Sequence, residues 1–185
     1  MATDQDASGP GSVTREAVRN STTPMPPNIR LATADDSEAL AWLTQELLTF
    51  YGLPLRYQRS YMDHAISAGA FTEYSGLKIL LACNNSAPIG FLAFSEIFAL
   101  AACQRSIFIQ DLFVARKARR SGAGRALMDA LIHHAHENQV TQIDWTADPW
   151  NSNAARFYEK IGPLLKSEKI FYRLPQEKLK SFLRK

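Results

Sequence analysis

A glycine-containing segment at 119–124, Arg-Arg-Ser-Gly-Ala-Gly, is the part of this 185-residue chain whose residue types and spacing point most directly to chemistry. It stands between an apolar, strand-like run at 106–114 and a helix-like run at 125–137. Glycines allow the backbone to close around an anion, and the first turn of a helix presents amides that have no intrahelical acceptor. The spacing therefore predicts a loop that binds a phosphate or pyrophosphate group.

Basic side chains surround this loop. Cations gathered at a helix N-terminus repel its partial positive charge unless an anion is bound there. The cations are Arg116, Lys117, Arg119, Arg120 and Arg125. Taken alone, the loop could equally be a tight turn with a solvated basic face. No Lys-Ser or Lys-Thr follows the glycines, and Leu127 occupies the last position of Gly-x-Gly-x-x-Gly, so nucleotide hydrolysis and dinucleotide binding are disfavoured.

A second informative run, Trp-Asn-Ser-Asn-Ala-Ala-Arg-Phe-Tyr-Glu-Lys-Ile-Gly, lies downstream at 150–162. By itself, a Phe-Tyr pair in a short amphipathic helix is typical of core packing. Together, the two runs resemble the GCN5-related N-acetyltransferases (the GNAT family), which carry Arg/Gln-x-x-Gly-x-Gly/Ala in a loop and Asn-x-x-Ala-x-x-Phe-Tyr-x-x-x-Gly in a later helix. The matching residues are Arg119, Gly122, Gly124, Asn151, Ala154, Phe157, Tyr158 and Gly162.

The resemblance implies a fold of the α/β (α+β) class, the GNAT fold, in which helices flank a central mixed, mostly antiparallel sheet. It implies an enzyme that moves an acetyl group from acetyl-CoA to an amine by direct attack, without a metal. Tyr158 would be the general acid that protonates the leaving thiolate. The acetyl-CoA site would comprise Leu112, Phe113, Val114, Arg119, Arg120, Ser121, Gly122, Ala123, Gly124, Arg125, Asn151, Ser152, Asn153, Ala154 and Phe157.

Within the family the chain looks most like the diamine (spermidine/spermine) branch, on the opening run at 29–36 and the Ile-Gln-Asp-Leu-Phe-Val strand at 109–114. Two positions depart from that branch. Gln110 stands where the branch has a Glu that holds or deprotonates the amine, and Phe50 and Tyr51 stand near a second acidic position. Polyamine acetylation is therefore in doubt. The resemblance places Phe50, Tyr51, Gln110, Asp111 and Trp145 on the acceptor side.

The missing carboxylate matters because a primary alkylamine of pKa about 10.4 is neutral in roughly one molecule in 2,500 at pH 7. An α-amine of pKa about 7.7–8.0 needs far less help. One hypothesis is a weakly basic acceptor, such as the α-amine of an amino acid or peptide, or an arylamine. The other is that Asp111, Asp148, Glu96 or a water chain replaces the base.

Two other functions are considered beside acetyl transfer. The chain could hold coenzyme A without turnover, with Gln110 marking a lost active site. Binding of nucleic acid through the basic loop is disfavoured, because no aromatic residues are interleaved with the charges. The acceptor is therefore expected to be a small molecule or a peptide amine, and family members often form homodimers.

The elements that must position these residues alternate along the chain. Leucines at spacings of three and four predict a helix at 35–51, and alternating apolar runs predict strands. We predict strands at 29–32, 77–83, 88–98, 106–114, 142–146 and 169–173, and helices at 35–51, 56–68, 125–137, 151–161 and 175–183. Such an order packs as a sheet with helices on its faces.

Composition and residue spacing limit the domain organisation, compartment and metal content that we expect. Residues 1–28 are polar and lack apolar periodicity, which predicts a disordered leader, and 29–185 suit a single domain. No run approaches the length of a membrane span. Cys83 and Cys103 lack metal or redox spacing, which favours a reduced, cytoplasmic compartment. No acidic or thiolate residue completes a ligand set with His133, His134 and His136, so no metal is expected.

Overall fold

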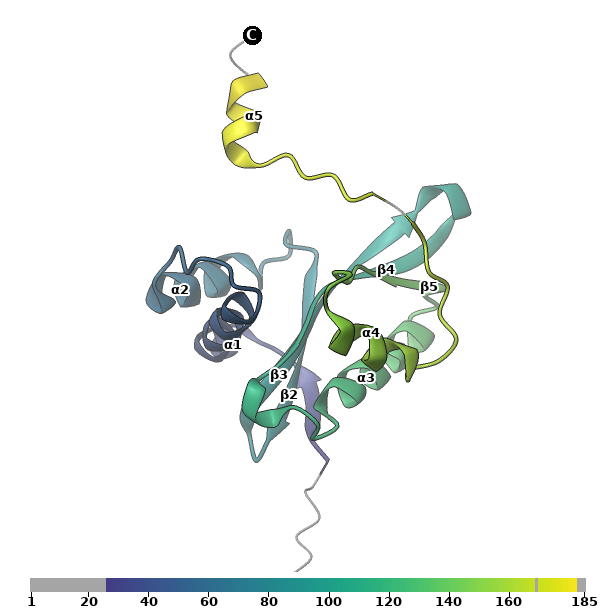
Figure 1. The fold of residues 1–185 in the computed structure, drawn as a ribbon, viewed down its shortest axis with the longest axis horizontal. Coiled ribbons are helices and arrows are strands. Elements are labelled where there is room, and N and C mark those ends of the chain that lie inside the picture. The colour runs from purple at the N-terminus through teal and green to yellow at the C-terminus, as the bar shows by residue number, and fades with distance from the viewer. Residues whose placement is uncertain (1–25, 169, 183–185) are drawn as a thin grey trace, which may run out of the picture.

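The computed structural model describes residues 26–168 and 170–182, and these build a five-stranded sheet in the order β1-β2-β3-β4-β5 (Figure 1). Pairing is antiparallel from β1 to β4, and β5 joins β4 in parallel. The strands are β1 (Asn28–Leu31), β2 (Leu77–Asn84), β3 (Ala87–Ala99), β4 (Gln104–Val114) and β5 (Gln142–Trp145). The mixed, mostly antiparallel sheet predicted from the sequence is confirmed.

Helices cover both faces of this sheet (Figure 1). α1 and α2 lie on one face, and α3 and α4 lie on the other. The helices are α1 (Ser37–Phe50), α2 (Arg59–Gly69), α3 (Ala123–Glu137), α4 (Ser152–Glu159) and α5 (Gln176–Phe182), with short 3-10 turns η1 (Ala34–Asp36), η2 (Leu100–Ala102) and η3 (Arg116–Ala118). No helix in the described part of the chain is long and apolar enough to span a membrane.

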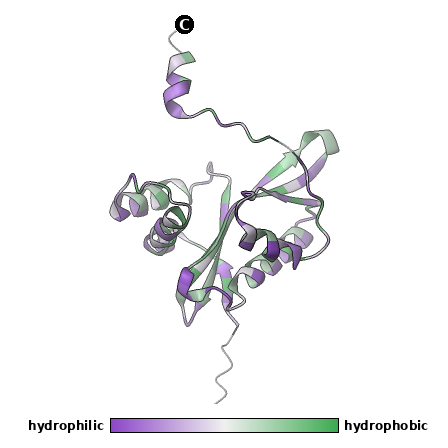
Figure 2. Ribbon diagram, in the orientation of Figure 1, coloured by the Kyte–Doolittle hydropathy of each residue, from purple (hydrophilic) through white to green (hydrophobic). Residues whose placement is uncertain are grey.

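The period-two alternation of the strands divides the core into two layers. Leu92 and Phe94 of β3 pack with α3, whereas Phe91 and Ala93 face α1. Each layer contains a fully buried leucine from its helix, Leu131 from α3 and Leu43 from α1. Figure 2 shows the apolar residues running along the central strands and onto the projecting end of the β3–β4 hairpin.

A β-bulge interrupts the long hairpin of β3 and β4. Ala93 pairs with Asp111, but the next residue, Phe94, pairs with Ile109, so Gln110 is the extra residue on β4. Such a bulge bends its strand and increases the local twist. β5 pairs with β4 only from Ser106 to Ile109, and β4 continues past the bulge without a neighbour on that side. The bulge and the short β5 together open the sheet beside the last residues of β4.

The strand predicted at 169–173 is wrong. Residues 170–173 form no strand, and residue 169 lies outside the described residues. The chain leaves the body after α4 and runs out to α5 (Figure 1), so no strand lies beside it to complete a ladder. Its apolar side chains are consequently exposed, Tyr172 to 84%. Of the leader predicted at 1–28, residues 1–25 lie outside the described residues, and Asn28 begins β1.

Candidate active site

The basic loop between β4 and α3 has the tight turn that its glycines predict. Arg120 and Gly122 both have left-handed backbones, with φ of 66° and 88°. This geometry turns the chain sharply so that α3 begins at Ala123, and the Ser121 hydroxyl accepts a hydrogen bond from the Ala123 amide at 3.4 Å. The following amides belong to the first turn of a 15-residue helix, where N–H groups lack intrahelical acceptors. The loop thus offers backbone donors to an anion.

The open edge of β4 lies next to this loop. The Ala115 amide donates to the Ile89 carbonyl of β3 at 2.9 Å. Because antiparallel pairs alternate, the backbone groups of Phe113 also face β3, and those of Leu112 and Val114 face the opposite, unpaired side. The Val114 carbonyl there accepts a hydrogen bond from Arg119 Nε at 3.2 Å. These groups can pair with the amides of an extended ligand.

α4 stands across this opening. The side chain of Asn151 caps it by accepting a hydrogen bond from the Ala154 amide at 3.1 Å. Phe157 packs against α3: a Cβ on Gly124 would meet two atoms of its ring at 3.4 Å. The next side chain, Tyr158, packs against Trp145 of β5, with ring centroids 5.1 Å apart. The two motifs recognised in the sequence are therefore adjacent in space.

The phenol of Tyr158 is half-buried in this position. Burial, with a smaller contribution from the charge of Tyr51, raises its pKa to about 12. Tyr158 therefore keeps its proton throughout the physiological range. A phenol that stays protonated can donate to a leaving group but cannot serve as a resting base.

Tyr51, at the end of α1, approaches the same place from the other face of the sheet. Its ring is 5.6 Å from that of Trp150, and Phe50 completes the aromatic group at 6.0 Å from Trp150. Burial first, and then the charges of Asp148 and Asp111, raise the pKa of Tyr51. The ends of α1, β4 and the β5–α4 connection thus bring together an acidic, aromatic patch, formed by Phe50, Tyr51, Asp111, Asp148 and Trp150.

Asp111 of β4 contributes a carboxylate to this patch. Its residue surface is exposed, yet enough protein surrounds the carboxyl group for desolvation to raise its pKa. The neighbouring Gln110 instead donates from Nε2 to the Ser95 hydroxyl at 2.9 Å, so its amide is held against β3.

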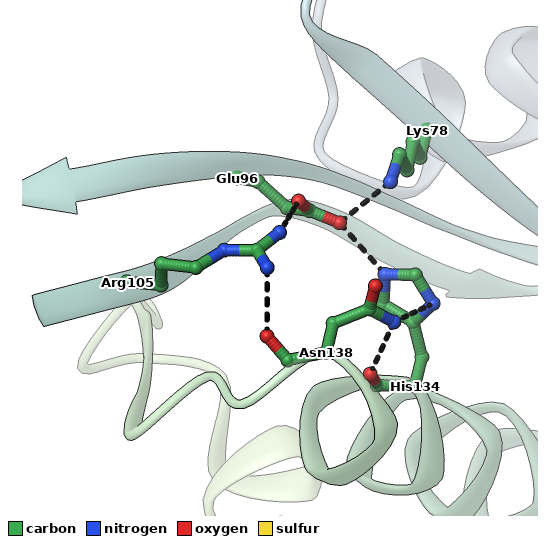
Figure 3. A network of polar contacts seen from close by, with 5 residues as sticks. All are labelled: Lys78, Glu96, Arg105, His134 and Asn138. Atoms are coloured by element: carbon green, nitrogen blue, oxygen red, sulfur yellow. Dashed lines mark hydrogen bonds and ion pairs between the residues drawn. The ribbon is translucent and has the colours of Figure 1, made fainter.

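Glu96, the other carboxylate considered as a base, is committed to a network on β3 (Figure 3). It accepts hydrogen bonds from Lys78 at 2.6 Å, Arg105 at 2.7 Å and His134 at 2.8 Å. The Lys78 bond is the largest of the effects that lower its pKa to about 2. A carboxylate so stabilised is a poor base for an ammonium group.

The structure brings together most of the residues predicted from the two motifs and adds one that sequence reasoning missed. Trp150 belongs to the matched run, but the resemblance does not place it in the site; the signal for it is a tryptophan directly before a helix cap. The guanidinium of Arg119, a residue predicted for the acetyl-CoA site, lies over the rings of Phe50, at 4.7 Å, and Phe113, at 5.7 Å. No cluster of metal-ligating residues occurs within 26–168 and 170–182.

Comparisons with known proteins agree with this geometry. The model of the acetyltransferase (GNAT) family matches residues 38–162. An uncharacterized N-acetyltransferase of Bacillus subtilis (strain 168), YhfO, is 30% identical over 135 residues, 73% of this chain and 88% of its own. The solved integron cassette protein VCH_CASS6 of V. cholerae has a TM-score of 0.78 at 27% identity, covering 87% of this chain and 99% of its own.

The chain therefore belongs to the GNAT family of acetyltransferases, as its two motifs predicted. The family, and not the diamine branch specifically, is what these similarities support. L-ornithine N5-acetyltransferase NATA1 of Arabidopsis thaliana is 29% identical over 98 residues. That match covers 53% of this chain and only 43% of NATA1, less than half of the relative's length.

Proposed function

We propose that this protein transfers an acetyl group from acetyl-CoA to the amine of a small amino compound by direct attack of the bound acceptor. The observation that carries the proposal is the convergence of the Tyr158 phenol with the open edge of β4 and the acidic, aromatic patch that includes Asp111. An acid, a backbone surface and a carboxylate that can bind an ammonium group in one place are what amine acetylation requires.

The donor's pyrophosphate would be bound by the amides of the 120–125 loop and the first turn of α3. Its amide-bearing arm would pair with the free backbone groups of Leu112 and Val114 beside the bulge. The N-terminal residues of α4, 151–154, would close the site from the other side, and Phe157 fixes α4 at the required distance from Gly124. A backbone amide near Leu112 would polarise the thioester carbonyl.

Tyr158 would donate its proton to sulfur as the carbon–sulfur bond breaks. A phenol of pKa about 12 is a weak acid for a thiolate of ordinary pKa about 8.5. The desolvation that raises the pKa of Tyr158 also raises that of a thiol released beside it, so the two groups are better matched in the site than in water.

Asp111 is the group that we propose in place of the missing glutamate base. Its pKa is raised, its surface is exposed, and its charge acts on Tyr51, on which the charge of Asp148 also acts. The name of NATA1 specifies acetylation of an amino acid at its side-chain nitrogen, a strongly basic amine that needs such a base. A weakly basic α-amine or arylamine is the competing acceptor class, and polyamines are the acceptors of the diamine branch.

Thiol release from acetyl-CoA, measured with a panel of diamino acids, α-amino acids, polyamines, arylamines, aminoglycosides and lysine peptides, tests the proposal. Release with an alkylamine, at a rate that Asp111→Asn lowers, is expected. Reaction only with weak amines and no dependence on Asp111 would contradict the assigned base. Absence of release with every amine, despite tight binding of coenzyme A, would favour the alternative that Gln110 suggests, a binding module without turnover.

We also propose that two copies pair through the described residues 163–168 and 170–175. Within the described residues β5 pairs only with β4, so its outer edge is free, and this segment exposes Leu165, Ile170, Phe171 and Tyr172. A strand of one copy added to β5 of the other would satisfy both. Sedimentation should give a dimer that Phe171→Asp weakens, and a monomer at micromolar concentration would refute this pairing.

A further inference from the structure

A cavity lies on the α1 face of the sheet, beside the end of β4 that also carries Asp111. This cavity of about 640 Å³ is bounded by α1, the start of α2, the end of β4 and η3. Its size is that of a small-molecule site. Three arginines (Arg59, Arg116 and Arg119), the carboxylate Glu46 and the rings of Trp42, Phe50 and Phe113 line it.

The charges of this cavity do not satisfy one another. Oε2 of Glu46 is buried and has no hydrogen-bond partner among the described residues. The guanidinium groups of Arg59 and Arg116 form no hydrogen bond or ion pair with any described residue, although both side chains line the same cavity as Glu46. A buried carboxylate oxygen without a donor is costly, so the site is complementary to a ligand that brings one.

The ligand that would satisfy both signs carries an ammonium and a carboxylate close together. An ammonium would donate to Glu46, and guanidinium forks would bind a carboxylate in bidentate fashion. Arg119 is partly engaged already by Phe50, Phe113 and the Val114 carbonyl. Arg59 and Arg116 are therefore the free cations of the site, one from each wall.

The cavity adjoins the acidic, aromatic patch. Phe113 lines the cavity, and Asp111 lies two residues earlier on the same face of β4, about 7 Å away by the rise of a strand. Phe50 lines the cavity too, and its ring is 5.3 Å from that of Tyr51. A ligand head in the cavity can thus extend a short aliphatic chain toward Asp111.

We propose that this cavity binds the α-amino-acid head of the acceptor, with its ammonium on Glu46 and its carboxylate on Arg59 and Arg116, while the side-chain amine reaches Asp111. This inference rests on the proposed acetyl transfer and narrows its acceptor to diamino acids of ornithine or lysine length. The reactive nitrogen is the distal one, and the α-amine is held away from the thioester.

Calorimetric titration of the wild-type protein without acetyl-CoA tests the inference independently of turnover. Three ligands differ by one group each: ornithine, putrescine, which lacks the carboxylate, and 5-aminopentanoate, which lacks the α-amine. Ornithine should bind at least about tenfold more tightly than either analogue, the effect of one lost charged hydrogen bond. Equal affinity for all three ligands would overturn the inference. The experiment uses only the wild-type protein, so its result does not depend on whether a variant folds.

Variants then locate the site. Glu46→Gln and Arg116→Gln should each raise the KM for ornithine about tenfold or more and leave the KM for putrescine within about twofold. Lys180→Gln is the control, because it removes an exposed cation from α5, whose residues do not line the cavity. If folded Glu46→Gln and Arg116→Gln proteins treat ornithine as the wild type does, the inference fails. Thiol release without preference for ornithine refutes the cavity assignment alone, whereas no release with any amine refutes the acetyl transfer.

Discussion

Phe157 of α4 rests directly over Gly124 of α3, where a Cβ would lie 3.4 Å from two ring atoms and 3.8 Å from a methyl group of Val114. The contact joins the loop motif, the helix motif and the open strand at one point. A branched side chain at Gly124 would push α4, and with it Tyr158, away from β5.

We therefore expect Gly124→Val to destabilise the fold by about 1–3 kcal/mol through overpacking and to lower kcat as well as affinity for acetyl-CoA. Urea unfolding and steady-state kinetics measure the two effects. Gly69→Val is the control for β-branching in a helix, because a Cβ there meets nothing within 4 Å. Gly124→Ala should stay within about 1 kcal/mol of wild type, since its contact is ordinary and alanine favours the helix. A valine variant with unchanged kinetics would show that α4 does not depend on this contact.

Tyr158→Phe should reduce kcat by about 10²- to 10⁴-fold, the usual contribution of a general acid, and leave the Kd for acetyl-CoA nearly unchanged. Rapid-quench measurement of acetyl transfer and calorimetric titration of acetyl-CoA separate the two quantities. Trp145→Phe keeps an aromatic neighbour for Tyr158 and controls for packing. Equal loss of affinity and turnover in the tyrosine variant would mean that the phenol has a binding role.

The pH dependence of the wild type follows from the same group. Burial raises the pKa of Tyr158 from 10.0 to about 12, so the acid form persists as the pH rises through 10. The rate, measured at a saturating concentration of the acceptor, should therefore not fall through deprotonation of Tyr158 below about pH 11. A descending limb centred near the ordinary phenol value of 10 would contradict the burial of this hydroxyl in the working enzyme.

The fold and the donor side of the site could be predicted from the sequence because their signals are local. Glycine spacing defines the loop, and Asn151 caps the helix that carries Tyr158, as its side-chain chemistry favours. The extra residue at Gln110 could not be predicted, since a bulge depends on the register of two strands. The segment at 170–173 has a strand-like composition, but strand formation also requires a neighbour. The cavity at Glu46 joins α1 to η3, residues far apart in sequence, and only tertiary packing brings them together.

Asp111→Asn should lower kcat with an alkylamine acceptor by about 10²-fold or more and remove an ascending limb from the pH–rate profile, because the amide cannot accept the proton. Glu96→Gln is its counterpart outside the site. Glu96 is already ionised above about pH 2 and tied to Lys78, Arg105 and His134, so this change should cost about 1–3 kcal/mol of stability and leave the pH–rate profile intact. The reverse pattern of effects would make Glu96, and not Asp111, the base.

The carboxylate of Asp36 stabilises the start of α1, and we expect this stabilisation to be lost in acid. Arg30 donates to both of its oxygens at 2.7 Å, and this bond, the largest effect on the group, lowers its pKa from 3.8 to about 2. A carboxylate whose pKa is depressed on folding contributes stability above its unfolded value of about 3.8 and loses that contribution as the pH falls through about 2. The shift corresponds to at most about 2.5 kcal/mol, and because the Arg30 side chain is 42% exposed we expect about 1–2 kcal/mol.

Asp36→Asn should therefore lower the free energy of unfolding by that amount at pH 7 and by much less at pH 2, as measured by urea unfolding at each pH. Asp35→Asn changes an exposed carboxylate of the same turn and should have little effect at either pH. A deficit in the Asp36 variant that persists undiminished at pH 2 would place the stabilisation in the geometry of the turn and not in the charge.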